Sequence, residues 1–97
     1  MAVEVYKGEM EALIRQGALL VDVREAEERT PDDGLPGHTH IPLSRIGELT
    51  AHLKEEQAVI FYCRSGLLSY QAAEIAAKWT ERPVYYLSGG LLGYTDA

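Results

Sequence analysis

The sequence is short of several residue types, and each shortage narrows what the protein can be. It has one cysteine, and no run of apolar residues reaches the length needed to span a membrane. A single cysteine cannot form a disulfide within the chain, which fits a reducing compartment and leaves the thiol free for chemistry. The first residues lack the basic start and long apolar stretch of a signal peptide. We therefore expect a cytoplasmic protein that does not associate with membranes.

Positive charge is scarce as well. The 97 residues include 9 Lys and Arg against 15 Asp and Glu, which gives a formal net charge of -6, and no basic cluster stands out. This balance disfavours nonspecific binding to nucleic acid, so we expect no nucleic-acid partner. The hydrophobic content of 46% is ordinary for a soluble globular protein. The length suits a single domain over residues 1–97 with one modest core.

Apolar, β-prone segments alternate with segments of helical spacing along the chain. Strands are predicted near residues 3–6, 18–23, 38–41, 58–62 and 84–87, and helices near 7–16, 44–54 and 71–79. The last helix would place Ala72, Ile75, Ala76 and Trp79 on one face. Between these elements we expect a polar, helix-prone turn over 24–29 and a loop over 30–37, which contains Pro31 and Pro36. The alternation predicts an α/β fold with a mainly parallel central sheet flanked by helices on both faces.

Two of the predicted strands end in polar or reactive residues. Cys63 follows one strand, and Asp22 and Arg24 stand at the end of another. Parallel sheets bind their ligands at the carboxyl ends of the strands. We therefore expect these residues to meet at the same edge of the sheet.

The segment from Tyr62 to Ser69 joins a predicted strand to a predicted helix, with the thiol at the turn. The first amides of a helix have no partners within it, and they carry the positive end of the helix dipole. Arg64 adds a full charge, and Gly66 permits the backbone to curl its amides toward one centre. We expect this arrangement to stabilise the thiolate of Cys63 and to make the residue a nucleophile. The predicted anion cradle consists of Arg64, Ser65, Gly66, Leu67, Leu68 and Ser69.

A buried structural cysteine at the end of a strand is the alternative, because free cysteine is among the most buried residue types. We rank it second. A core cysteine does not need the sequence Arg64-Ser65-Gly66 directly after it, whereas a nucleophile that binds anions does.

Four separated stretches resemble the signatures of the rhodanese family, in particular its single-domain members. They are Leu20–Glu25 with Glu28, Leu35–Gly37 followed by Ile41–Leu43, Cys63–Gly66 with Ser69, and Leu87–Gly90. The matches run in the right order from about Leu19 to Tyr94, and the set is specific although each match alone is weak.

The resemblance implies a sulfurtransferase. The cysteine would take a sulfane sulfur from thiosulfate or a persulfide donor, become a persulfide, and pass the sulfur to a nucleophilic acceptor, a thiol or a cyanide-like anion. No metal or organic cofactor is implied. Asp22 and Arg24 would brace the loop region, with Arg24 paired to Glu28. Leu68 stands where many thiosulfate-using relatives carry a second basic residue, so the donor stays open between thiosulfate and a protein or low-molecular-weight persulfide.

Two other functions compete with sulfur transfer. A cysteine phosphatase also uses a thiolate in an anion-binding loop, but it needs an arginine where this chain has Ser69, and it usually has a histidine where this chain has Tyr62. These two residues disfavour a phosphatase. A noncatalytic binding module is the second rival, because a fold does not guarantee an activity. The intact loop around Cys63 argues against it.

Some remaining residues invite a binding role. His38 and His40 share a face of a predicted strand and could chelate a metal, but no third ligand is close in the sequence, so we expect no metal site. Tyr62 and Tyr94 are candidates to line the mouth of the site.

Overall fold

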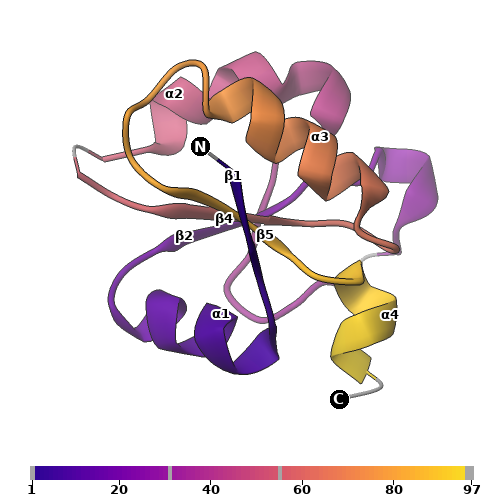
Figure 1. The fold of residues 1–97 in the computed structure, drawn as a ribbon. Coiled ribbons are helices and arrows are strands. Elements are labelled where there is room, and N and C mark those ends of the chain that lie inside the picture. Colours follow the sequence, from indigo (N-terminus) through magenta and orange to yellow (C-terminus); the bar gives the residue numbers. More distant parts are fainter. Residues whose placement is uncertain (1, 31, 55, 96–97) are drawn as a thin grey trace.

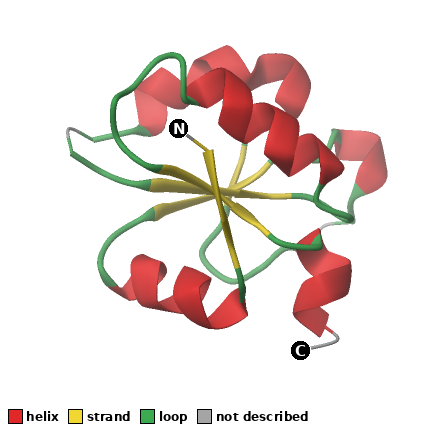
Figure 2. Ribbon diagram, in the orientation of Figure 1, coloured by secondary structure: helices red, strands yellow, loops and turns green. Residues whose placement is uncertain are grey.

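The computed structural model describes residues 2–30, 32–54 and 56–95. Pro31, which was expected in a loop, lies outside these ranges. So do Met1 and Ala97, the two ends of the predicted 1–97 domain. In the described part the chain forms a five-stranded sheet in the order β1-β5-β4-β2-β3, and every strand pairing is parallel (Figures 1 and 2). The strands are β1 (Ala2–Val5), β2 (Leu19–Asp22), β3 (Thr39–His40), β4 (Val59–Tyr62) and β5 (Val84–Leu87).

Strand β4 lies in the middle of the sheet, and all four of its residues are buried. The almost continuous apolar composition of β4 is typical of a strand that helices cover on both sides. Its neighbour β2 pairs with it so that Asp22 stands opposite Tyr62. The predictions of five strands and of a mainly parallel sheet are therefore confirmed.

Helices cover both faces of the sheet, as Figure 1 shows. One face carries α1 (Lys7–Arg15) and α4 (Gly90–Thr95), and the other carries α2 (Leu49–His52) and α3 (Leu67–Ala76). Two short 3-10 segments, η1 (Ala26–Glu28) and η2 (Leu43–Glu48), complete the elements. No helix in the described ranges is long and apolar enough to cross a bilayer.

The alternation of side chains along β4 divides the core into two clusters. Val59 and Phe61 point to the face covered by α2 and α3, where Cys63 also belongs to the cluster. Ile60 and Tyr62 point to the face covered by α1. Successive residues of a strand face opposite sides, so Cys63 and Tyr62 lie on different sides of the sheet.

Two predicted helices differ from the observed ones. The helix expected over 44–54 is a 3-10 segment followed by the short α2, with Arg45 at non-helical angles. Gly47 and Thr50 are weak helix formers, which explains why this stretch does not form one regular helix. The helix expected over 71–79 begins at Leu67 and ends at Ala76, so Trp79 lies beyond it and is 46% exposed rather than packed with the alanines.

Candidate active site

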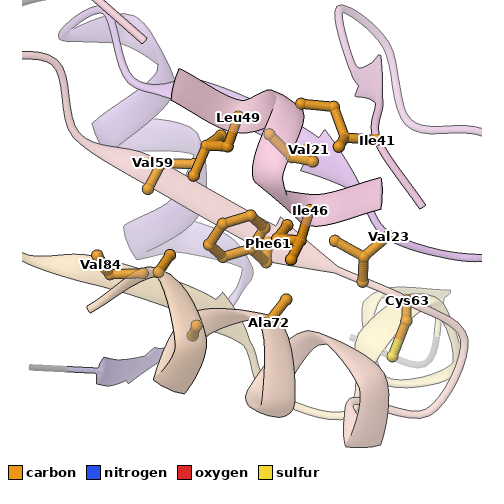
Figure 3. Packing of buried hydrophobic residues seen from close by; sticks show 12 residues of the cluster. Val21, Val23, Ile41, Ile46, Leu49, Val59, Phe61, Cys63, Ala72 and Val84 are labelled. Carbon is orange, nitrogen blue, oxygen red and sulfur yellow. The ribbon is translucent and has the colours of Figure 1, made fainter. Parts of the chain in front are cut away.

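Cys63 lies directly after β4, at the carboxyl edge of the sheet. The residue is only 1% exposed. Figure 3 shows it at one end of the hydrophobic cluster, next to the turn that leads into α3 and well apart from Leu49 and Val59. This burial is what the structural-cysteine alternative also expects, so the surroundings of the sulfur have to distinguish the two.

The sulfur accepts hydrogen bonds from two backbone amides. The amide nitrogen of Gly66 lies 3.1 Å from Sγ, and that of Ser69 lies 3.4 Å away. The hydroxyl oxygen of Ser69 is 3.5 Å from Sγ and donates its own hydrogen to the carbonyl of Gly66 at 3.1 Å. A thiolate at this position would keep both amide hydrogen bonds, and hydrogen bonds to a charged acceptor are the stronger kind.

The loop takes this shape because of Gly66. Its φ of +103° lies in the left-handed region that side chains rarely adopt, and it serves as the N-cap of α3. The chain therefore turns back over the sulfur, and the first turn of α3 brings the amide of Ser69 to it. Two backbone amides at the start of α3, those of Gly66 and Ser69, therefore converge on the sulfur, and anion binding by the whole 64–69 loop stays a prediction.

The other residues of the predicted cradle differ in exposure. Arg64 and Ser65 are exposed, and Leu67 is 63% exposed. Leu68 is half-buried and packs against the hydrophobic cluster, while Ser69 is buried. Within the described residues, the side chain of Arg64 takes part in no hydrogen bond or ion pair. The rim of the loop thus carries one cation, Arg64, together with the polar Ser65 and the apolar Leu67 and Leu68.

Asp22 and Arg24 form a buried ion pair at the end of β2. Nη2 of Arg24 lies 2.8 Å from Oδ2 of Asp22, and the backbone amide of Arg24 donates to Oδ1 at 3.0 Å. Burial alone would raise the pKa of Asp22, but these hydrogen bonds and the positive charge of Arg24 outweigh it and hold the pKa below its usual value. The same edge of the sheet carries Cys63, as the parallel topology predicted.

The pairing of Arg24 with Glu28 was wrong. The guanidinium instead grips Asp33, with Nη2–Oδ1 and Nη1–Oδ2 distances of 2.9 and 3.0 Å. It reaches Glu28 only at its carbonyl oxygen, at 3.5 Å, while the carboxylate of Glu28 accepts the amide of Glu25. Outside a helix, sequence spacing does not show whether Arg24 pairs with a residue four positions away or with one nine positions away. Among the described residues, the pair therefore contacts Glu28 and Asp33 and makes no hydrogen bond to residues 64–69.

Neither tyrosine lines the site. The hydroxyl of Tyr62 accepts the amide hydrogen of Leu35 at 3.0 Å on the opposite face of the sheet, and burial raises the pKa of this phenol. The hydroxyl of Tyr94 is 3.4 Å from Glu11, and the ammonium of Lys7 lies over its ring. Both contacts of Tyr94 are to α1. The expectation for Tyr62 failed because the alternation of strand residues sets it on the other side from Cys63.

The two histidines of the predicted strand 38–41, of which only His40 lies in β3, are engaged elsewhere. Nε2 of His40 bonds to the carbonyl of Arg24 at 2.6 Å, and the ring of His38 bonds to the carbonyl of Leu35 at 2.8 Å and to Arg29 at 3.0 Å. Across residues 2–30, 32–54 and 56–95, no group of three or more His, Cys, Asp or Glu side chains could hold a metal ion.

The fold agrees with comparisons to known proteins. A model of the rhodanese-like domain matches residues 7–97. The chain belongs to the rhodanese-like domain family. A sulfurtransferase of Allochromatium vinosum is 29% identical over 79 residues, which cover 81% of this chain and 73% of that protein.

Solved structures of bacterial proteins share this fold. A rhodanese homolog of Thermus thermophilus is 34% identical, with a TM-score of 0.70 over 93% of this chain and 98% of that one. The reduced CoADR-RHD of Bacillus anthracis superposes with a TM-score of 0.81 at 24% identity, which shows the fold. That match covers 96% of this chain but only 16% of the CoADR-RHD chain.

Two features of this rhodanese-like domain were not found from the sequence. Asp33 completes the ion pair of Arg24, and the only signal for it was its place in a loop rich in Gly and Pro. The helical state of α4 was also missed, since two glycines lower the helix propensity of its six residues.

Proposed function

We propose that this protein is a sulfurtransferase in which Cys63 carries a sulfane sulfur as a persulfide. The observation that supports the proposal best is the pair of amide hydrogen bonds to Sγ, from Gly66 at 3.1 Å and Ser69 at 3.4 Å. A structural cysteine needs no donors aimed at its sulfur. A nucleophile gains from them, because they stabilise the thiolate and the anionic persulfide that follows.

The first half-reaction begins with the Cys63 thiolate. It attacks the outer, sulfane sulfur of the donor, forms a new sulfur–sulfur bond, and breaks the bond from that sulfur to the rest of the donor. With thiosulfate the leaving group is sulfite, which departs with the bonding electron pair. With a persulfide donor the leaving group is a thiolate. In either case one negative charge remains on the new persulfide of Cys63.

The second half-reaction restores the enzyme. A nucleophilic acceptor, a thiolate or a cyanide-like anion, attacks the outer sulfur of the persulfide. The bond between the two sulfurs breaks, and the Cys63 thiolate leaves with its electron pair. No electrons enter or leave overall, so the proposed cycle needs no redox cofactor and no metal.

The composition of the rim favours a persulfide donor over thiosulfate. Arg64 supplies one exposed cation, but Leu67 is 63% exposed and Leu68 takes no part in charge binding. A dianion such as thiosulfate gains more from a second cation than a monoanionic persulfide does. We therefore assign thiosulfate as the poorer donor.

The experiment is intact-mass spectrometry after exposure to thiosulfate or to glutathione persulfide, with Cys63→Ser as the control. The proposal expects a gain of one sulfur atom on the wild-type protein and none on Cys63→Ser, followed by loss of that atom when an excess of thiol is added. Absence of the added sulfur with both donors would overturn it and favour the noncatalytic binding module.

A further inference from the structure

The short helix α4 holds the cysteine loop from the side away from α3. The amide of Leu91 donates to the carbonyl of Cys63 at 2.9 Å, and the amide of Leu92 donates to the carbonyl of Arg64 at 3.1 Å. These are the first two carbonyls after β4, and Arg64 is also the first residue of the predicted cradle. The loop is therefore pinned at its entrance by a helix that is distant in the sequence.

The fixed direction of these two carbonyls also fixes the direction of the N–H groups that follow them. In a planar trans peptide unit the C=O and the next N–H point in opposite directions. The chain has no cis peptide bond among its described residues. Because the carbonyls of Cys63 and Arg64 point at α4, the N–H groups of Arg64 and Ser65 point away from it.

Gly90 allows α4 to come this close. Its φ is +57°, and a Cβ at this position would collide with the carbonyl oxygen of Cys63 and would lie 2.7 Å from both the carbonyl carbon and the carbonyl oxygen of Arg64. These are backbone atoms, which cannot move aside as the end of a flexible side chain can. A residue larger than glycine at position 90 has to push α4 off the loop or turn the two peptide units.

We propose that Gly90 is a positioning residue: by letting the first amides of α4 bind the carbonyls of Cys63 and Arg64, it aims the Arg64 and Ser65 amides into the anion cradle. The inference deepens the proposed function and rests on it for the identity of the anion. The orientation of the amides, however, can be measured without any sulfur donor.

The test compares the alkylation of Cys63 by iodoacetate, an anion, and by iodoacetamide, its neutral counterpart. The ratio of the two rates cancels the thiolate fraction and reports how well the loop attracts an anion. Gly90→Ala should lower this ratio by about tenfold, the effect of losing a hydrogen bond to a charged group. Gly37→Ala is the matched control, because Gly37 has a φ of +78° but no atom within 4 Å of an added Cβ.

A second pair of variants removes one hydrogen bond without adding a Cβ at position 90. Leu92→Pro deletes the amide that binds the carbonyl of Arg64, in the first turn of α4 where proline is tolerated. Leu92→Ala keeps that amide and truncates the same exposed side chain. The proline variant should lower the ratio of the iodoacetate rate to the iodoacetamide rate, and the alanine variant should leave this ratio unchanged.

If Gly90→Ala folds and keeps the wild-type ratio of the iodoacetate rate to the iodoacetamide rate, the inference is overturned. If Gly90→Ala does not fold, the Leu92 pair decides, with equal ratios in the two variants counting against it. In the wild-type protein, hydrogen exchange measured by NMR should be slow at the Leu91 and Leu92 amides, and rapid exchange at both would overturn the inference without any variant. A lowered ratio in a protein that takes up no sulfur from either donor would uphold the positioning role and reject the sulfurtransferase.

Discussion

Arg24 and Asp22 are joined through a guanidinium and a carboxylate that are both almost completely removed from solvent, with Nη2 and Oδ2 2.8 Å apart. The same guanidinium extends to Asp33, so one buried cation holds the end of β2 and the following loop together. Desolvation makes each charge costly when the other is absent. The relationship therefore governs the stability of the sheet edge that carries Cys63, and it leads to the first two predictions.

Arg24→Met should strongly destabilise the fold. Removing one partner of a buried ion pair leaves an uncompensated charge, and the loss in unfolding free energy is about 3 to 5 kcal/mol. Urea unfolding at neutral pH measures it. Arg45→Met is the matched control, because Arg45 pairs with Glu48 on the surface and its loss should change stability little. Equal effects of the two substitutions would contradict the structural role of Arg24.

Stability should fall in acid, and Arg24 should be the reason for part of the fall. Arg24 holds the pKa values of Asp22 and Asp33 below their usual range in the folded protein. The stability that comes from these lowered pKa values is fully present above the unfolded-state pKa of about 4. It is lost as the pH falls through the lower pKa values of the two carboxyl groups in the folded protein. Urea midpoints between pH 7 and pH 2.5 should therefore drop steeply for the wild type. A variant with Arg24→Met should show a shallower decline, and an identical pH dependence would count against the prediction.

Gly66→Ala should damage both the fold and the site. At a φ of +103° a side chain costs about 1 to 2 kcal/mol, and the added Cβ would press on the backbone of Gly89 at 3.3 Å. Gly17→Ala controls for the strain, since Gly17 has a φ of +102° and open space around it. Both variants should lose stability in thermal unfolding, but only Gly66→Ala should lose uptake of sulfur by Cys63 in intact-mass spectrometry. Normal sulfur uptake by folded Gly66→Ala would show that the turn does not shape the site.

Leu68→Lys should improve the use of thiosulfate. A second cation near the loop should raise kcat/KM for thiosulfate by about fivefold, and the gain should shrink as salt screens it. The rate with glutathione persulfide should change less. Gln71→Lys, an exposed position one turn along α3, controls for the added charge alone. A gain of equal size from Gln71→Lys would mean that net charge, and not the identity of residue 68, limits the reaction.

Much of the site was predictable because its signals are local. The apolar run of β4 and the following Arg64-Ser65-Gly66 indicated a thiol at a strand-to-helix turn, and Gly66 does take the left-handed angle that the turn requires. The extent of α3 was predicted less well. The helix starts at Leu67, directly after the turn at Gly66, rather than near residue 71.

The order of the five strands, the parallel sheet and the place of Cys63 at its carboxyl edge could be predicted from the sequence, because hydrophobic periodicity and turn residues act over a few positions. Only the tertiary structure decided the partner of Arg24, the side of the sheet that Tyr62 occupies and the formation of α4. These depend on groups brought together from distant parts of the chain. The amides of Leu91 and Leu92 gain their partners only once β4 and β5 lie side by side, and that contact, more than helix propensity, places α4 against the cysteine loop.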